Sequence, residues 1–179
     1  PRSTLFPYTT LFRSMFNPDK FQWRTFDASE NIPAHVLPWL LDNSSLTAKL
    51  KYKYSDFHVN VISQVENTPY GCELKLLGDI EDETIIVREV ELIGAEQPVV
   101  FARSVIPKTI DTNKLLAIGT KPLGELLFDD PLISRDQLEV GQHLGTWARR
   151  STFVVGSTKL LVSERSEERR VGKECRSRW

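Results

Sequence analysis

Two stretches in the middle of the chain alternate apolar and polar residues and are separated by a short turn segment. Residues 84–93 and residues 99–106 both repeat with the period of two that is typical of β-strands. The connection between them, residues 94–98, begins with glycine and ends with proline, which predicts a hairpin turn. Because a hairpin pairs its strands antiparallel, this segment restricts the chain to folds with an antiparallel sheet.

Further strand patterns lie on both sides of this hairpin. Residues 57–61 alternate like the central pair, and residues 74–77 are expected to add another short strand. Gly156-Ser157 predicts a second tight turn near the C-terminus. Around that turn the last strands are expected at residues 137–141, 147–155 and 159–164.

Three segments have a helical pattern. Residues 32–44 carry apolar residues at helical spacing, and Pro38 inside this segment predicts either a break or a late start. Ser45 is a suitable N-cap for a second helix, and Pro122 opens a short third helix that extends through Phe128. Since no strand–helix–strand alternation occurs, the sequence predicts an α+β domain, a single antiparallel sheet with helices on one side.

The two ends of the chain translate one stretch of DNA read on opposite strands. TLFPYTTLFRS, residues 4–14, is the translation of a common short-read sequencing adapter, and RSEERRVGKEC, residues 165–175, is the translation of its reverse complement. A basic tail that binds nucleic acid would not produce this relation between two distant segments. We therefore expect residues 1–14 and 165–179 to be adapter-derived, flanking a native domain, residues 15–164, that is truncated at its C-terminus.

Setting these ends aside changes the charge balance. The whole chain has 23 Lys+Arg and 24 Asp+Glu; the ends hold eight and three of them, which leaves 15 against 21 and a net charge near −6. An acidic domain without a basic run is a poor candidate for nucleic-acid binding.

The cysteine content and the hydropathy of the chain indicate its cellular compartment. Cys72 is the single cysteine of residues 15–164, so no disulfide framework is available. No apolar stretch approaches the roughly 18 residues of a membrane span, and nothing after Met15 has the pattern of a signal peptide. We expect a cytoplasmic globular protein of one domain.

Three charged residues occupy strand positions whose neighbours on the same face of the sheet, which we call a row, are apolar. Arg88 shares a row with Val90 and Leu92, Arg103 occupies a similar place one strand later, and Glu164 ends the row of the terminal strand. A buried charge needs a partner. Arg88 and Glu164 could pair with each other or with neighbours; alternatively, the planar guanidinium of Arg88 is available for the carboxylate of a ligand.

Other candidates have weaker patterns. Arg149 and Arg150 should point to opposite faces of a strand, so that one of them is expected to be solvated. The three histidines lack metal-ligand spacing, and the sequence has no glycine-rich phosphate loop, nucleophile elbow or carboxylate cluster for magnesium. No metal site is expected.

Several strings of the sequence, taken together and in order, resemble one family. VREVELIGAEQPVVFARSVIP, LGELLF, SRDQLEVGQHLGTWARRSTF and GSTKLLVSE, within residues 86–164, are similar to chorismate–pyruvate lyase, also called 4-hydroxybenzoate synthetase. Residues 39–47 resemble the family's N-terminal helical hairpin. The resemblance implies an antiparallel sheet whose helices act as flaps over a buried ligand cavity.

The resemblance also implies a function and a site. A lyase of this family converts chorismate into 4-hydroxybenzoate and pyruvate, the first committed step toward ubiquinone, without a cofactor and, we expect, as a monomer. Carried over to this sequence, Arg88 meets the ring carboxylate, Leu123 lines the cavity and Glu164 meets the hydroxyl end. Leu46 takes the flap position often held by methionine. Arg88 and Glu164 are the expected catalytic residues, with Glu164 donating or shuttling a proton in an apolar surround.

Two questions stay open from the sequence. The group that holds the enolpyruvyl carboxylate is either Arg103 or a pair of backbone amides. The alternative function is a small-acid effector-binding module, of the kind found as ligand domains of transcription regulators, which binds without catalysis; an inert fragment is a third possibility. An assay of chorismate cleavage together with 4-hydroxybenzoate binding separates these readings.

Overall fold

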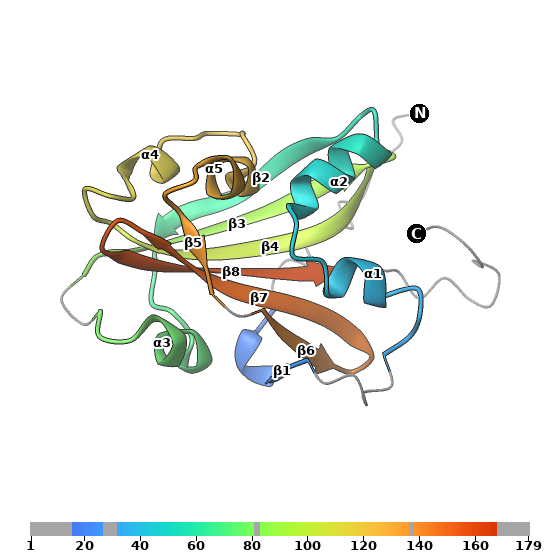
Figure 1. Cartoon of the computed structure of the whole chain (residues 1–179), viewed down its shortest axis with the longest axis horizontal. Helices are drawn as coiled ribbons and strands as arrows, with labels where there is room; N and C mark the ends of the chain where they lie inside the picture. The colour runs from blue at the N-terminus through green and yellow to red at the C-terminus, as the bar shows by residue number, and fades with distance from the viewer. Residues whose placement is uncertain (1–15, 27–31, 81–82, 137, 168–179) are drawn as a thin grey trace, which may run out of the picture.

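The computed structural model describes residues 16–26, 32–80, 83–136 and 138–167. The described strands form one antiparallel sheet in the order β1-β6-β7-β8-β4-β3-β2, and β5 pairs with β7 beside this path (Figure 1). This architecture confirms the predicted α+β fold with a single antiparallel sheet. The strands are β1 (Gln22–Thr25), β2 (His58–Glu66), β3 (Ile85–Gly94), β4 (Gln97–Pro107), β5 (Ser134–Arg135), β6 (Glu139–His143), β7 (Thr146–Val155) and β8 (Thr158–Ser166).

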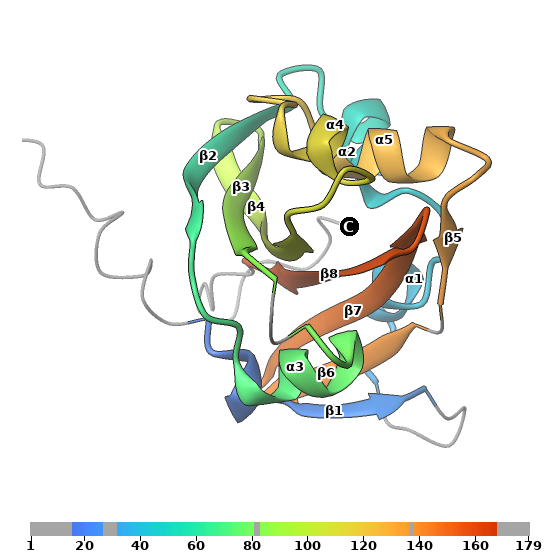
Figure 2. The ribbon, with the colours of Figure 1, turned by 90° about the vertical axis from the view of Figure 1, so that its left-hand side faces the viewer.

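Short helices lie on both faces of the sheet, with α2, α4 and α5 on one side and α3 on the other (Figure 2). Leu50 of α2 packs with Val90, whereas Leu77 of α3 packs with Val87, three residues away on the same strand and therefore on the opposite face. The expectation of helices on one side is thus wrong for α3. The helices are η1 (Pro18–Lys20), α1 (Leu37–Leu40), α2 (Leu46–Lys53), α3 (Gly71–Leu77), α4 (Asn113–Leu116) and α5 (Leu123–Asp129).

The central hairpin is tighter than the five-residue connection expected from the sequence. Gly94 pairs with Gln97, which leaves Ala95 and Glu96 as a two-residue turn with φ of 51° and 59°. Positive φ at both turn positions is the type I′ geometry that matches the twist of paired strands. Asp56 stabilises this turn by accepting hydrogen bonds from the two turn amides, at 3.0 and 2.7 Å.

Two predicted elements differ from the structure. Residues 74–77 belong to α3 and not to a strand, because a short apolar run does not by itself distinguish the two and Glu73 caps the helix by accepting from the Tyr70 amide at 2.8 Å. Residues 32–44 form only a turn and α1, in which Pro38 occupies the first turn. Of the two effects expected of Pro38, the late start is therefore the one that occurs.

The start of α2 agrees with the sequence. The Ser45 hydroxyl accepts from the Ala48 amide at 3.3 Å, as expected of an N-cap. α2 then packs Leu46 and Leu50 against the sheet, and α5 packs Leu123 and Leu127 against it next to α2. The two helices together cover the sheet face that carries the candidate site. No helix in the described part of the chain is long and apolar enough to cross a membrane.

β8 continues past Glu164, the expected end of the native domain. Arg165 and Ser166 pair with β4 in register, and Ser166 is buried. The Arg165 guanidinium lies 5.4 Å from the ring centre of Phe16 and 5.3 Å from that of Phe101. These two residues therefore belong to the sheet, although they fall in the segment expected to be adapter-derived. The rest of the two predicted adapter segments, Glu167 excepted, lies outside the described residues.

Candidate active site

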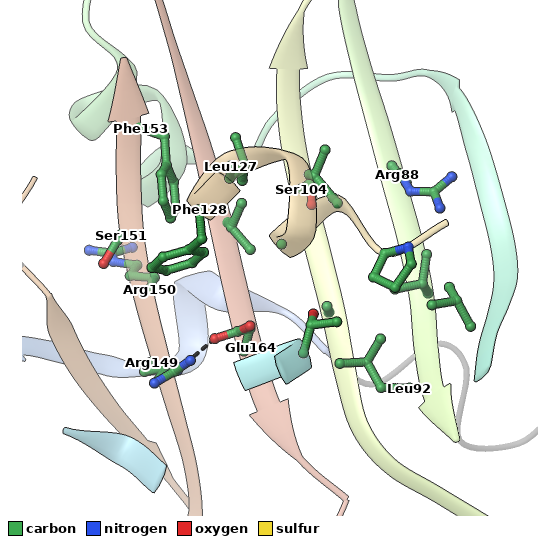
Figure 3. A pocket seen from close by; sticks show the side chains of 18 of the residues that line it. Arg88, Leu92, Ser104, Leu127, Phe128, Arg149, Arg150, Ser151, Phe153 and Glu164 are labelled. Carbon is green, nitrogen blue, oxygen red and sulfur yellow. Dashed lines mark hydrogen bonds and ion pairs between the residues drawn. The ribbon is translucent and has the colours of Figure 1, made fainter. Parts of the chain in front are cut away.

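One cavity lies between the sheet and the helices α2 and α5. Its floor comes from β3, β4, β8 and β7, and its roof comes from the first residues of α2 and from α5. Figure 3 shows Arg88 on one side of the cavity and the Arg149–Glu164 pair on the other. The polar side of the lining consists of Thr47, Arg88, Ser104, Arg135, Arg149, Arg150, Ser151 and Glu164, and the apolar side includes Val90, Leu92, Leu123, Leu127, Phe128, Phe153 and Val162.

Arg88 is a buried cation whose partners are all neutral. Its Nη1 donates to Gln64 Oε1 at 2.7 Å, and its Nη2 donates to the carbonyl oxygens of Gly119 at 2.8 Å and Lys121 at 3.4 Å. Its Nε is buried without a hydrogen-bond partner among the described residues. Burial lowers the pKa of Arg88, because surroundings that exclude water disfavour the charged form of the guanidinium. Arg88 and Glu164 do not pair with each other.

Glu164 pairs with a different arginine. Arg149 Nε donates to Glu164 Oε2 at 2.6 Å, and Arg149 Nη1 donates to the carbonyl oxygens of Trp39 and Asp42, both at 2.8 Å. The expectation of an apolar surround for Glu164 is therefore wrong, and Arg149 anchors the glutamate to the end of α1.

Arg149 and Arg150 both differ from the expectation that one of them is solvated. Arg149 is 2% exposed and Arg150 is 6% exposed. Arg150 Nε donates to Glu139 Oε2 at 2.7 Å, and its guanidinium lies 4.2 Å from the ring centre of Trp23. Glu139 of β6 thus neutralises the charge of Arg150, and Arg150 takes no part in the Arg149–Glu164 pair.

Arg135 adds a second cation close to Glu164. Its Nε donates to Ser151 Oγ at 3.0 Å, and its Nη1 donates to the carbonyl oxygen of Asn43 at 3.1 Å. Burial lowers the pKa of Arg135, and the nearby charge of Arg149 lowers this pKa further, while Glu164 opposes the shift. Arg135 thus lines the same cavity as the Arg149–Glu164 pair, and no carboxylate of the described residues forms an ion pair with it.

The two leucines expected at the site have different positions. Leu123, the first residue of α5, is buried and lines the cavity. Leu46 is buried beneath α2 among Val59, Val90 and Leu92, and the next residue, Thr47, reaches the cavity in its place. Leu46 thus supports the cavity wall from behind and does not line it.

Arg103 lies on the sheet face away from the cavity. Its Nε donates to Glu73 Oε1 at 2.8 Å and its Nη1 donates to Glu89 Oε1 at 2.9 Å, beneath the ring of Tyr70. Burial is the largest single effect on the pKa of Arg103 and lowers it. Glu73 and Glu89 together outweigh burial, so the pKa of Arg103 is raised. Arg103, one of the two groups expected to hold the enolpyruvyl carboxylate, is therefore unavailable for that role.

The sequence contained a signal for Arg149 but none for Arg135. Gly156 and Ser157 form a two-residue turn, so Val155 faces Thr158 and each step away from the turn adds one pair, which places Arg149 opposite Glu164. The predicted turn fixes this register. Arg135 enters the site from β5, a strand of two residues that has no periodic pattern to detect.

The charges of the site define the ligand that it can hold. Arg88, Arg135 and Arg149 against Glu164 give this part of the cavity a formal charge of +2, which suits an anionic ligand with more than one acidic group. The apolar side chains next to them suit a ring. Among the described residues, no group of three or more His, Cys, Asp or Glu side chains could hold a metal ion.

Known proteins that this chain resembles carry closely similar descriptions. A family model described as chorismate lyase matches residues 17–166. A probable chorismate pyruvate-lyase of Aromatoleum aromaticum is 35% identical, over 82% of this chain and 92% of the relative. One of Psychromonas ingrahamii is 39% identical, over 73% and 81%. A chorismate pyruvate-lyase of Pectobacterium carotovorum subsp. carotovorum is 34% identical, over 74% and 77%.

Proposed function

The chain belongs to the chorismate lyase family, and we propose that it converts chorismate into 4-hydroxybenzoate and pyruvate. The observation that carries this proposal is the placement of charge in the cavity. A buried guanidinium without an anionic partner, Arg88, lies across the cavity from the one carboxylate of the described lining, Glu164. Chorismate and 4-hydroxybenzoate both carry a ring carboxylate opposite a ring hydroxyl.

Arg88 is the proposed anchor for the ring carboxylate. Its Nε–H is buried and has no partner, so a carboxylate that accepts from it would satisfy an unpaired donor as well as neutralise a buried charge. Gln64 and the carbonyl oxygens of the loop before α5 hold the guanidinium in place. Such an arrangement binds a carboxylate with a fixed orientation, which the reaction requires.

Glu164 is proposed to meet the hydroxyl-bearing end of the ring. Its Oε2 is engaged by Arg149, which leaves Oε1 to accept a hydrogen bond from the ring hydroxyl. Glu164 is also the base of the described lining that could take the proton from the same ring carbon. Arg149 acts as a positioning residue, because it holds the carboxylate and does not itself need to touch the substrate.

The reaction needs bond cleavage and proton movement but no redox change. The C3–O bond breaks and its electron pair leaves with the enolpyruvyl oxygen. The hydrogen on C4 leaves as a proton, and its bonding pair completes the aromatic ring. The enolpyruvate takes up one proton at its methylene carbon and becomes pyruvate, so atoms and charge balance. Aromatisation supplies the driving force, and the protein's part is to orient the substrate and stabilise the departing negative charge.

The helices α2 and α5 are proposed to separate when the ligand enters and leaves. They form the roof of the cavity, and Leu123 contributes an apolar contact to the ring from that roof. Leu46 holds α2 against the sheet and thereby shapes the roof indirectly. We further propose, from the family resemblance, that the protein acts as a cytoplasmic monomer without a cofactor and supplies 4-hydroxybenzoate toward ubiquinone.

The test is to incubate the protein with chorismate and to measure 4-hydroxybenzoate and pyruvate, which should form in equal amounts. Glu164→Gln keeps the size of the side chain and removes the base; we expect kcat to fall by about a hundredfold or more, while 4-hydroxybenzoate still binds. Binding of 4-hydroxybenzoate without any turnover by the unaltered protein would instead support the effector-binding alternative.

A further inference from the structure

We propose that Arg135 binds the enolpyruvyl carboxylate of the substrate, a role for which the sequence offered only Arg103 or backbone amides. This inference rests on the proposed function, because it names the second anionic subsite of the same cavity. It goes beyond the anchoring of the ring by Arg88 and Glu164, since 4-hydroxybenzoate does not carry the enolpyruvyl group.

Among the described residues, Arg135 is held in place by neutral groups alone. Its hydrogen-bond partners are a hydroxyl, Ser151 Oγ, and the backbone carbonyl of Asn43. Its guanidinium lies 5.5 Å from the ring centre of Phe128 and 5.7 Å from that of Phe153, two rings that meet edge to face. The two rings and the two oxygens fix the guanidinium but leave its charge without an anion.

The other described arginines near the cavity are already paired with carboxylates. Arg149 donates to Glu164 and to two carbonyl oxygens, and Arg150 is paired with Glu139. Arg103 is on the other face of the sheet, between two carboxylates. Among the described residues that line the cavity, Arg88 and Arg135 are the two guanidinium groups without a carboxylate partner.

The position of Arg135 in the sheet also fits this role. In the sheet order, β3 with Arg88 lies on one side of β8 with Glu164, and β7 lies on the other side with β5 and Arg135 beyond it. The ring carboxylate and the hydroxyl of the substrate would span the distance from Arg88 to Glu164. The enolpyruvyl ether stands on the carbon next to the hydroxyl-bearing carbon, so its carboxylate would extend past Glu164 toward Arg135.

Charge complementarity supports the same assignment. The formal charge of +2 that Arg88, Arg135 and Arg149 give together with Glu164 matches a substrate with two carboxylates, whereas 4-hydroxybenzoate has one. After the C3–O bond breaks, the second carboxylate belongs to pyruvate and leaves the ring. A guanidinium at this place would also stabilise the enolate as negative charge develops on the departing oxygen.

The experiment compares Arg135→Gln with Arg88→Gln, using chorismate turnover and 4-hydroxybenzoate binding as separate readouts. For Arg135→Gln we expect kcat/KM for chorismate to fall at least a hundredfold while the Kd for 4-hydroxybenzoate changes less than threefold. For Arg88→Gln both quantities should worsen by tenfold or more. Arg135→Lys should recover part of the lost kcat/KM, because it restores the charge but not the planar fork.

The binding readout separates a substrate contact from a structural role. Arg135 also donates to Asn43 in the loop before α2, so a purely structural role would weaken 4-hydroxybenzoate binding as much as chorismate turnover. Arg165→Gln is the matched control, since this arginine also stacks on two aromatic rings but lies outside the cavity lining; it should leave turnover within threefold.

Two results would overturn the inference: an unchanged kcat/KM in Arg135→Gln, or equal losses in turnover and 4-hydroxybenzoate affinity. Failure of the unaltered protein to release 4-hydroxybenzoate and pyruvate would contradict the proposed function itself, which keeps the two outcomes distinguishable.

Discussion

At the scale of single residues, the strongest constraint is the uncompensated charge of Arg88. Arg88 is 3% exposed, and its guanidinium depends on three neutral oxygens for its hydrogen bonds. We predict that Arg88→Ala weakens 4-hydroxybenzoate binding by about 2–5 kcal/mol, the range for losing one partner of a buried charge-assisted pair. Arg88→Lys should keep only part of the affinity, since lysine cannot form a two-pronged contact. Calorimetric titration measures both; equal affinity of Arg88→Ala and the unaltered protein would remove Arg88 from the site.

Arg149 provides a prediction about stability. Arg149→Met leaves the Glu164 carboxylate and two backbone carbonyls without their donor, and we expect a loss of about 3–5 kcal/mol in the free energy of unfolding. The double change Arg149→Met with Glu164→Leu should recover part of this loss, because no unpaired charge stays buried, but it should stay inactive. Urea unfolding of the three proteins gives the values. A double variant less stable than Arg149→Met would contradict the ion-pair interpretation.

At the scale of elements, the sequence predicts correctly the strands that lie next to a recognisable turn. The hairpins β3–β4 and β7–β8 could be predicted because alternation identifies the strands, and for β7–β8 the two-residue turn at Gly156-Ser157 also fixes the register. α3 was misassigned, because its apolar run is too short to separate helix from strand without knowledge of the Glu73 cap. β1 and β5 were missed since each has only a few residues and depends on a partner strand that is distant in sequence.

The contact between α2 and α5 tests whether these helices act as a movable roof. A Cβ added at Gly124 of α5 would lie 2.8 Å from Thr47 Oγ1 of α2, too close without a shift. We predict that Gly124→Ala separates the two helices and weakens 4-hydroxybenzoate binding by about 1–2 kcal/mol. Adding Thr47→Ala removes the opposing atoms and should restore affinity. Stopped-flow dissociation rates check this: unchanged release in Gly124→Ala would show that the roof accommodates the methyl group without opening.

At the scale of the whole molecule, the site depends on bringing together segments that lie far apart in the sequence. Arg88 comes from β3, Glu164 from β8 and Arg135 from β5, and the sheet order places them around one cavity. Arg88 and Glu164 could be anticipated because each interrupts a regular apolar strand pattern. Arg103 interrupts such a pattern too, but it lies on the opposite face of the sheet, where Glu73 and Glu89 neutralise its charge. The alternation of side chains along a strand shows which residues share a face of the sheet. Only the packed structure shows which of the two faces encloses the cavity.

The last strand allows a prediction about the C-terminal segment that we propose to be adapter-derived. Arg165 and Ser166 extend β8, and the Glu167 amide donates to the Val99 carbonyl at 3.1 Å. Backbone pairing of this kind is available to nearly any residue, and the Arg165 guanidinium covers two aromatic rings. A translated adapter segment can therefore prolong the strand and keep Glu164 inside it.

We accordingly predict different results for two truncations. Removal of residues 168–179 should leave both the melting temperature and 4-hydroxybenzoate affinity unchanged, because a translated adapter has not been selected to pack against this domain. Removal of residues 165–179 should cost about 2 kcal/mol, from the lost ladder hydrogen bonds and ring contacts, and lower the melting temperature by about 4–8 °C. It should also reduce turnover, because Glu164 would then end the chain and its strand would fray. Calorimetric melting and the pyruvate assay distinguish the two proteins, and equal behaviour of both would show that β8 holds Glu164 without the residues that follow it.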